Sequence, residues 1–76
     1  MSETEVESEI TGNVWKIEVK VGDKVQEEDV IMILESMKME IPVEATCAGT
    51  LVELKVKVED QVDEDQVVAV IDSGKL

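Results

Sequence analysis

Candidate chemistry in this sequence centres on one lysine, Lys38, which lies at the midpoint of the 76 residues between Met37 and Met39. An amine is a potential nucleophile, but it needs a base or an activated partner in order to react. The sequence contains no histidine and no visible nucleophile–base pair, so a self-contained enzyme is disfavoured. Exposed methionines on both sides of a lysine are uncommon, because exposed apolar pairs cost solubility and usually mark a contact site. The pattern therefore favours a lysine recognised by another protein over an ordinary solvated lysine.

The residues around Lys38 predict a tight β-hairpin. An apolar run at residues 30–34 precedes the lysine motif, and a shorter apolar segment at residues 41–43 follows it. A two-residue loop at Met37-Lys38 sets the register of the two strands, with the pairs Ser36–Met39, Glu35–Glu40 and Leu34–Ile41. Such loops usually contain Asn-Gly or a similar pair, because they need positive φ. A Met-Lys loop is therefore expected to be mildly strained, which invites a functional explanation.

Alternating and continuous apolar runs predict that the whole chain is all-β. Residues 1–5 are polar and acidic and are expected to fray, so the first strand is placed at residues 6–10. Residues 14–21 and 51–58 alternate between apolar and charged side chains, which is typical of half-buried strands. Residues 30–34 and 67–71 are continuous apolar runs, which indicate buried strands. Pro42 fits an edge position of the strand that follows the hairpin.

The second half of the sequence repeats the first. A shift of 37 residues aligns residues 1–39 with 38–76 without a gap, and 13 of the 39 pairs are identical, among them Gly12/Gly49 and Val30/Val67. Two copies are too few for a solenoid, so we expect two β units packed face to face about a pseudo-twofold axis. The lysine hairpin then lies at one end of the domain and both termini lie at the other. In this symmetry Lys75 is the counterpart of Lys38.

The motif Ser36-Met37-Lys38-Met39 resembles the Ala-Met-Lys-Met signature of biotinyl domains, and the resemblance runs from about residue 6 to residue 71. It is closest to small stand-alone biotin/lipoyl attachment proteins. It implies one domain over residues 1–76, with an ordered core of about 6–73, folded as a flattened barrel or sandwich of two four-stranded antiparallel sheets. It also implies that Lys38 carries covalent biotin. The recognition residues are then Met37 and Met39, with the hairpin flanks Glu35, Ser36 and Glu40.

The family chemistry implies a carboxyl carrier with a swinging arm, which is not itself an enzyme. A biotin ligase activates biotin with ATP as an acyl-adenylate, and the Lys38 amine attacks it to form an amide. The modified domain then visits a biotin carboxylase and a carboxyltransferase, and tethering supplies a high local concentration of cofactor to both. Lysine amines are mostly protonated at pH 7, so activation is expected to come from the ligase. Recognition of hairpin shape then selects one of the seven lysines.

Two alternatives stay open. Lipoyl domains resemble this chain throughout, so a lipoyl carrier of a 2-oxo acid dehydrogenase-type system is the second possibility, with lipoate on Lys38. The lysine of lipoyl domains usually follows Asp and precedes Ala, so methionine on both sides favours biotin. The third possibility is a structural or adaptor module whose hairpin is an interface and is never modified.

Composition limits the choice of partners. The net charge of −12 argues against nucleic acid and anionic membranes, and Trp15, the single aromatic residue, offers no platform for stacking bases. The acidic surface favours basic partner surfaces. There is no apolar run of membrane-spanning length, no signal peptide and no motif of metal-ligand spacing. The lone Cys47, expected to be a small buried hydrophobe, fits a reducing cytoplasm.

Three turn positions depart from the family pattern. Glu28, Glu59 and Asp65 occupy positions that are often glycine in relatives. Glycine adopts positive φ without penalty, whereas glutamate does so poorly and aspartate somewhat better. We therefore expect these turns to adopt different types, with no consequence for the attachment hairpin.

Overall fold

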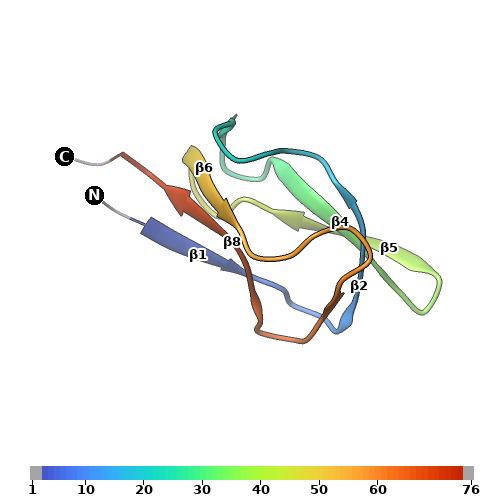
Figure 1. The fold of residues 1–76 in the computed structure, drawn as a ribbon. Coiled ribbons are helices and arrows are strands. Elements are labelled where there is room, and N and C mark those ends of the chain that lie inside the picture. Colours follow the sequence, from blue (N-terminus) through green and yellow to red (C-terminus); the bar gives the residue numbers. More distant parts are fainter. Residues whose placement is uncertain (1–2, 75–76) are drawn as a thin grey trace.

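The computed structural model describes residues 3–74, which form two antiparallel β-sheets and contain no helix. The eight strands are β1 (Glu3–Glu7), β2 (Gly12–Ile17), β3 (Lys24–Val25), β4 (Val30–Ser36), β5 (Met39–Glu44), β6 (Gly49–Leu54), β7 (Gln61–Val62) and β8 (Val67–Asp72). The strand order is β1-β8-β6-β3 in one sheet and β5-β4-β2-β7 in the other. The two sheets form a flattened sandwich (Figure 1). The predicted all-β class with two four-stranded sheets is confirmed.

The pseudo-twofold symmetry predicted from the repeat is present in the topology and in the register. The strands form four pairs related by the 37-residue shift: β1 with β5, β2 with β6, β3 with β7 and β4 with β8. When each strand is replaced by the other member of its pair, the order β1-β8-β6-β3 becomes β5-β4-β2-β7, which is the order of the second sheet. The pairing of Val6 with Ala69 in the first sheet becomes the pairing of Val43 with Met32 in the second. Each sheet is therefore built from strands of both halves, and neither half forms a sheet alone.

The core lies between the two sheets and is built from symmetry-related apolar side chains. Leu34 and its counterpart Ile71 are fully buried, as are Ile31 and its counterpart Val68. Burial of each such side chain contributes about 1.5–3 kcal/mol to folding. The continuous apolar runs of β4 and β8 supply most of this core because these strands are interior in their sheets.

Several predicted strand boundaries are wrong. The first strand is Glu3–Glu7 instead of residues 6–10, because pairing with β8 holds residues 3–5 in the sheet in spite of their polar composition. The strands expected at residues 14–21 and 51–58 end at Ile17 and Leu54. In both cases the register shifts within the strand and the chain then leaves the sheet toward a tight turn. Val21 and Val58, which follow, are 57% and 49% exposed.

The expectation that Glu28, Glu59 and Asp65 change the turn type is also wrong. All three adopt the positive φ that glycine would supply, at 76°, 80° and 70°. The physical reason is a backbone hydrogen bond from each of these N–H groups to a carbonyl oxygen in a distant segment. The donor–acceptor distances are 2.8 Å for Glu28–Ala45, 2.8 Å for Glu59–Val14 and 2.7 Å for Asp65–Ser8. These bonds attach the connecting loops to the sandwich, and they hold the three residues in the strained positive-φ conformation.

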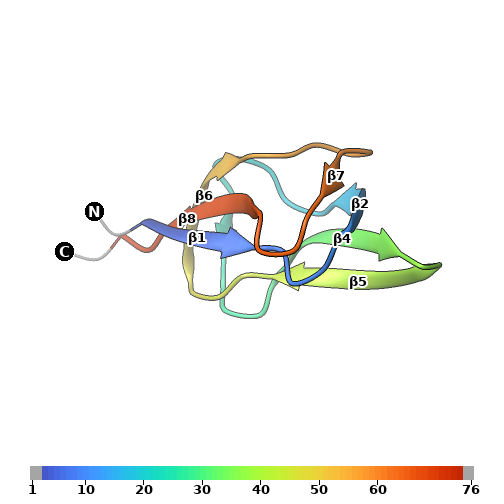
Figure 2. The same cartoon turned by 90° about the horizontal axis from the view of Figure 1, so that it is seen from below.

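The two ends of the sandwich differ in what they carry. The β4–β5 hairpin projects from one end, whereas the start of β1 and the end of β8 lie at the opposite end (Figure 2). β5 is an edge strand, so the missing backbone N–H of Pro42 is tolerated there, as predicted. The fold thus places Lys38 far from the points at which the chain enters and leaves the sheets.

Candidate functional site

The loop of the β4–β5 hairpin consists of Met37 and Lys38, as predicted. Ser36 pairs with Met39, Glu35 with Glu40 and Leu34 with Ile41. Met37 has a φ of 53° and Lys38 a φ of 66°. Positive φ at both positions matches a type I′ turn, whose twist suits the right-handed twist of the two strands. Left-handed backbone costs a non-glycine residue about 1–2 kcal/mol, so the tip is strained and its shape is set by the strands below it.

The tip presents its side chains to solvent. Met37 is 91% exposed, Met39 is 62% exposed, and Lys38 is exposed between them. Within residues 3–74 the Lys38 amine makes no ion pair or hydrogen bond. Glu35 and Glu40 are exposed on the two strands just below the loop. The structure therefore brings all six predicted hairpin residues together around one free amine, with Ser36 half-buried at the base.

The base of the hairpin is held by a close approach between strands that no local sequence pattern predicts. A Cβ atom on Gly12 would lie 2.7 Å from the carbonyl oxygen of Glu35 and 3.3 Å from the Cβ of Ser36. Only glycine lets β2 approach β4 so closely. The same contact recurs at the other end, between Gly49 and the carbonyl oxygen of Asp72. The identity of Gly12 and Gly49 in the repeat was the signal for this positioning role.

No group of three or more acidic, cysteine or histidine side chains within residues 3–74 could hold a metal ion. Cys47 is half-buried and packs against the core, so it is less buried than predicted. In the described part of the chain, no helix has the length and apolar character needed to cross a membrane. Lys75, the counterpart of Lys38, lies outside the described residues.

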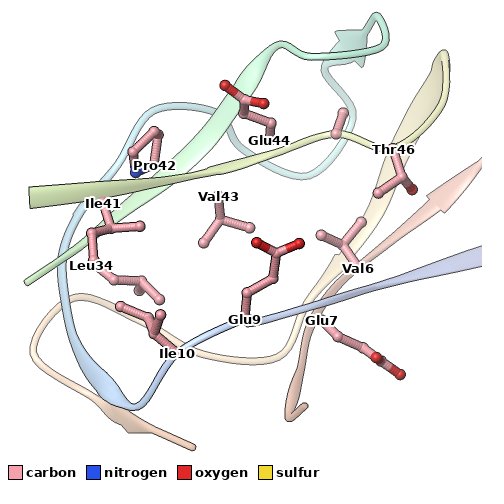
Figure 3. Close-up of a pocket in the computed structure, with 11 residues that line it drawn as sticks. Val6, Glu7, Glu9, Ile10, Leu34, Ile41, Pro42, Val43, Glu44 and Thr46 are labelled. Carbon is pink, nitrogen blue, oxygen red and sulfur yellow. The ribbon is translucent and has the colours of Figure 1, made fainter. Parts of the chain in front are cut away.

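A small cavity of about 180 Å³ lies where the edge strands β1 and β5 of the two sheets meet. Val6, Val43 and Leu34 contribute apolar walls, and the Glu9 carboxylate is the acidic group that faces the space between Val6 and Val43 (Figure 3). Glu7 points away from it (Figure 3). Lys38 does not line this cavity. The candidate site is therefore the exposed hairpin tip.

Two symmetric sheets thus present one lysine at an exposed hairpin tip, between two exposed methionines. A family model described as "biotin-requiring enzyme", the biotin/lipoyl family, matches residues 2–71. The chain belongs to the biotin/lipoyl attachment family.

Curated relatives match the chain over about half of its length. The biotin/lipoyl attachment protein of Bacillus subtilis is 51% identical over 37 residues, which are 49% of this chain and 51% of that protein. The biotinylated protein TB7.3 of Mycobacterium tuberculosis is 47% identical over 38 residues, or 50% of this chain and 54% of that protein. A putative urea carboxylase of Emericella nidulans is 53% identical over 38 residues, 50% of this chain but 3% of that protein.

Among solved structures, the urea carboxylase of Kluyveromyces lactis contains a similar domain. It superposes with a TM-score of 0.88 at 38% identity and covers 93% of this chain and 6% of that enzyme. A long-chain acyl-CoA carboxylase matches with a TM-score of 0.83 at 22% identity, covering 90% of this chain and 7% of that one, and shows the shared fold.

Proposed function

We propose that this protein is a biotin carboxyl carrier that is biotinylated on Lys38 and is itself not catalytic. The observation that carries the proposal is the geometry of the tip. A free amine stands at a two-residue turn with positive φ at both residues, between two exposed methionines, at the end of the domain opposite the start of β1 and the end of β8. The relatives named as biotinylated or as carboxylases support the same assignment.

The residues at the tip fit a covalently attached biotin. The Lys38 amine is unpaired within residues 3–74 and stands away from the cavity between β1 and β5, so an arm on it can extend into solvent. Bound biotin supplies a ring nitrogen that takes up and releases a carboxyl group. The protein holds the lysine at the tip of a strained turn whose strands are fixed by the core, with Leu34 fully buried at the base. That arrangement orients the arm without a binding pocket.

The attachment step needs an activated acyl group, because an amine does not displace an oxygen from a free carboxylate. A biotin ligase supplies biotinyl-adenylate, and the neutral lysine amine attacks its acyl carbon with the nitrogen lone pair. The C–N bond forms, the bond from the acyl carbon to the phosphate oxygen breaks, AMP departs with that electron pair, and the surplus proton on nitrogen passes to solvent. A biotin carboxylase and a carboxyltransferase are the two enzymes between which the modified domain moves. The single unpaired cysteine fits a reducing cytoplasm.

Methionine on both sides of Lys38 favours biotin over lipoate. The experiment is to incubate the purified protein with a bacterial biotin ligase, ATP and biotin, and separately with a lipoate ligase, ATP and lipoate, and to measure intact mass. We expect one biotinyl adduct and little lipoylation. Efficient lipoylation without biotinylation would assign the protein to the lipoyl carriers, and no adduct with either ligase would favour an adaptor module.

A further inference from the structure

Besides the two methionines, exposed apolar side chains lie on the β5-β4-β2-β7 sheet and in the loop before β7. Trp15 on β2 is 47% exposed and Val58, in the loop before β7, is 49% exposed. Both line one shallow depression together with Asn13, Val14, Glu35 and Glu59. We call this surface the Trp15–Val58 patch. Glu35 joins the patch to the attachment hairpin, because it lies two residues before Met37.

The patch is held firmly against the sheet. The N–H of Val14 donates to the carbonyl oxygen of Asp60 at 2.8 Å, and the N–H of Glu59 donates to the carbonyl oxygen of Val14 at 2.8 Å. These two bonds fix the Val58 loop beside β2. Trp15 lies at the register shift between β2 and β4, and its side chain is 47% exposed, whereas the preceding Val14 is 1% exposed.

Symmetry shows that the fold does not require a tryptophan there. The counterpart of Trp15 is Val52, 37% exposed, and the counterpart of Val58 is Val21, 57% exposed. The equivalent backbone bonds join Leu51 to Gly22 and Asp23 at 2.7 and 2.8 Å, so the two patches have the same scaffold. A large exposed aromatic side chain therefore occurs only in the patch that adjoins the lysine hairpin. Tryptophan is one of the three residue types enriched in interface hot spots.

We infer that the Trp15–Val58 patch is a docking surface for the biotin ligase; this inference rests on the proposed function. At about 3.3 Å per strand residue, Trp15 lies roughly 15 Å from Lys38 along the β4–β5 hairpin. A standard interface buries about 800 Å² on each partner, which is a disc of roughly 16 Å radius. A ligase bound over the hairpin tip therefore reaches Trp15.

The ligase is the partner that must make this contact. It reacts with the lysine nitrogen itself, so its active site has to approach within one lysine side chain of the hairpin backbone. The carboxylase and the carboxyltransferase are reached by the longer biotinyl-lysine arm and can act without touching the sheet. Glu35 and Glu59 line the depression and no lysine does, so the ligase surface that fits is an apolar recess with a basic rim.

The test compares Trp15→Val, which copies the symmetry mate, with Val52→Ala in the equivalent patch at the other end. Initial rates of biotin transfer by a bacterial biotin ligase are measured against the concentration of unmodified protein. We expect Trp15→Val to raise KM about tenfold or more and to leave kcat within twofold of the parent value. This pattern results when a contact that stabilises the bound complex and the transition state equally is lost. Val52→Ala is expected to leave both constants unchanged. A folded Trp15→Val variant with a parental KM would overturn the inference.

A second measurement does not depend on a variant. Trp15 is the single tryptophan, so incorporation of 5-fluorotryptophan gives one ¹⁹F resonance that reports on the patch. We expect saturating biotin ligase to change the chemical shift of this resonance, in addition to the broadening that any large complex causes. An unchanged chemical shift with bound ligase, or one that changes with a biotin carboxylase and not with the ligase, would refute the docking assignment. Failure of the proposed function is distinct, because the parent protein would then show no biotin on Lys38 in the mass measurement.

Discussion

Replacing either turn glutamate with glycine, in Glu28→Gly or Glu59→Gly, is expected to stabilise the fold. Both residues are exposed and adopt positive φ, at 76° and 80°. The left-handed conformation costs a non-glycine residue about 1–2 kcal/mol, whereas glycine loses about 0.5–1 kcal/mol more conformational entropy on folding. The difference is a net gain of about 0.5–1 kcal/mol for each replacement. In a domain of this size it raises the melting temperature by roughly 2–8 °C.

A matched control separates the backbone effect from the charge effect. Glu27 is the exposed neighbour of Glu28, is not among the residues with positive φ, and carries the same charge. Glu27→Gly relieves the same electrostatic repulsion as Glu28→Gly but gains nothing in the backbone, and glycine costs it about 0.5–1 kcal/mol. Thermal melts followed by circular dichroism compare the two variants with the parent. Equal shifts for Glu27→Gly and Glu28→Gly would refute the reasoning, because charge alone would then explain both.

Three other predictions concern charge, the methionines and the base of the hairpin. The net charge of −12 destabilises the fold through repulsion between carboxylates, and salt screens this repulsion. Raising the ionic strength to about 0.15 M, where the Debye length is about 8 Å, should therefore raise the melting temperature. A melting temperature that stays flat or falls with added salt contradicts this. Met37→Asp combined with Met39→Ala should change the free energy of unfolding by no more than about 0.5 kcal/mol per residue. The same double variant should reduce biotin transfer and improve lipoyl transfer in ligase assays, and identical behaviour with both ligases would remove the methionines as the discriminator. Gly12→Ala should destabilise by about 1–3 kcal/mol in urea melts, because its Cβ meets the Glu35 carbonyl; Asn13→Ala, at an exposed position, is the control and should stay within about 0.5 kcal/mol.

The hairpin and the symmetric sandwich could be predicted from the sequence because their signals are local or repeated. The flanking apolar segments fix the pairing of Glu35 with Glu40, and a slip of one residue would turn Leu34 out of the core. The 37-residue repeat then dictates that every strand has a counterpart. Both patterns can be recognised in the sequence without knowledge of any long-range contact.

Strand ends and turn geometry could not be predicted, because they depend on contacts between distant segments. Pairing with β8 extends β1 back to Glu3, and the acidic sequence of that segment contains no local pattern that predicts a strand. Val21 continues an alternating run in the sequence, but it lies in a tight turn outside the sheet. The Asp23 carboxylate closes this turn by accepting a hydrogen bond from the Lys20 N–H. The positive φ of Glu28 is imposed by its hydrogen bond to Ala45, 17 residues away. In each case tertiary structure overrides local preference.

The central claim is that a ligase reads a lysine held at a rigid two-residue turn. Lys75 provides an internal control, because it repeats the Ser-x-Lys-apolar pattern of Lys38 at the equivalent position of the 37-residue repeat. The direct measurement is peptide mapping of the biotin ligase product for the parent, Lys38→Arg and Lys75→Arg. We expect biotin on Lys38 alone, no labelling of Lys38→Arg, and unchanged extent and rate for Lys75→Arg. Biotin on Lys75, or labelling that survives Lys38→Arg, would contradict both the site and its recognition by shape.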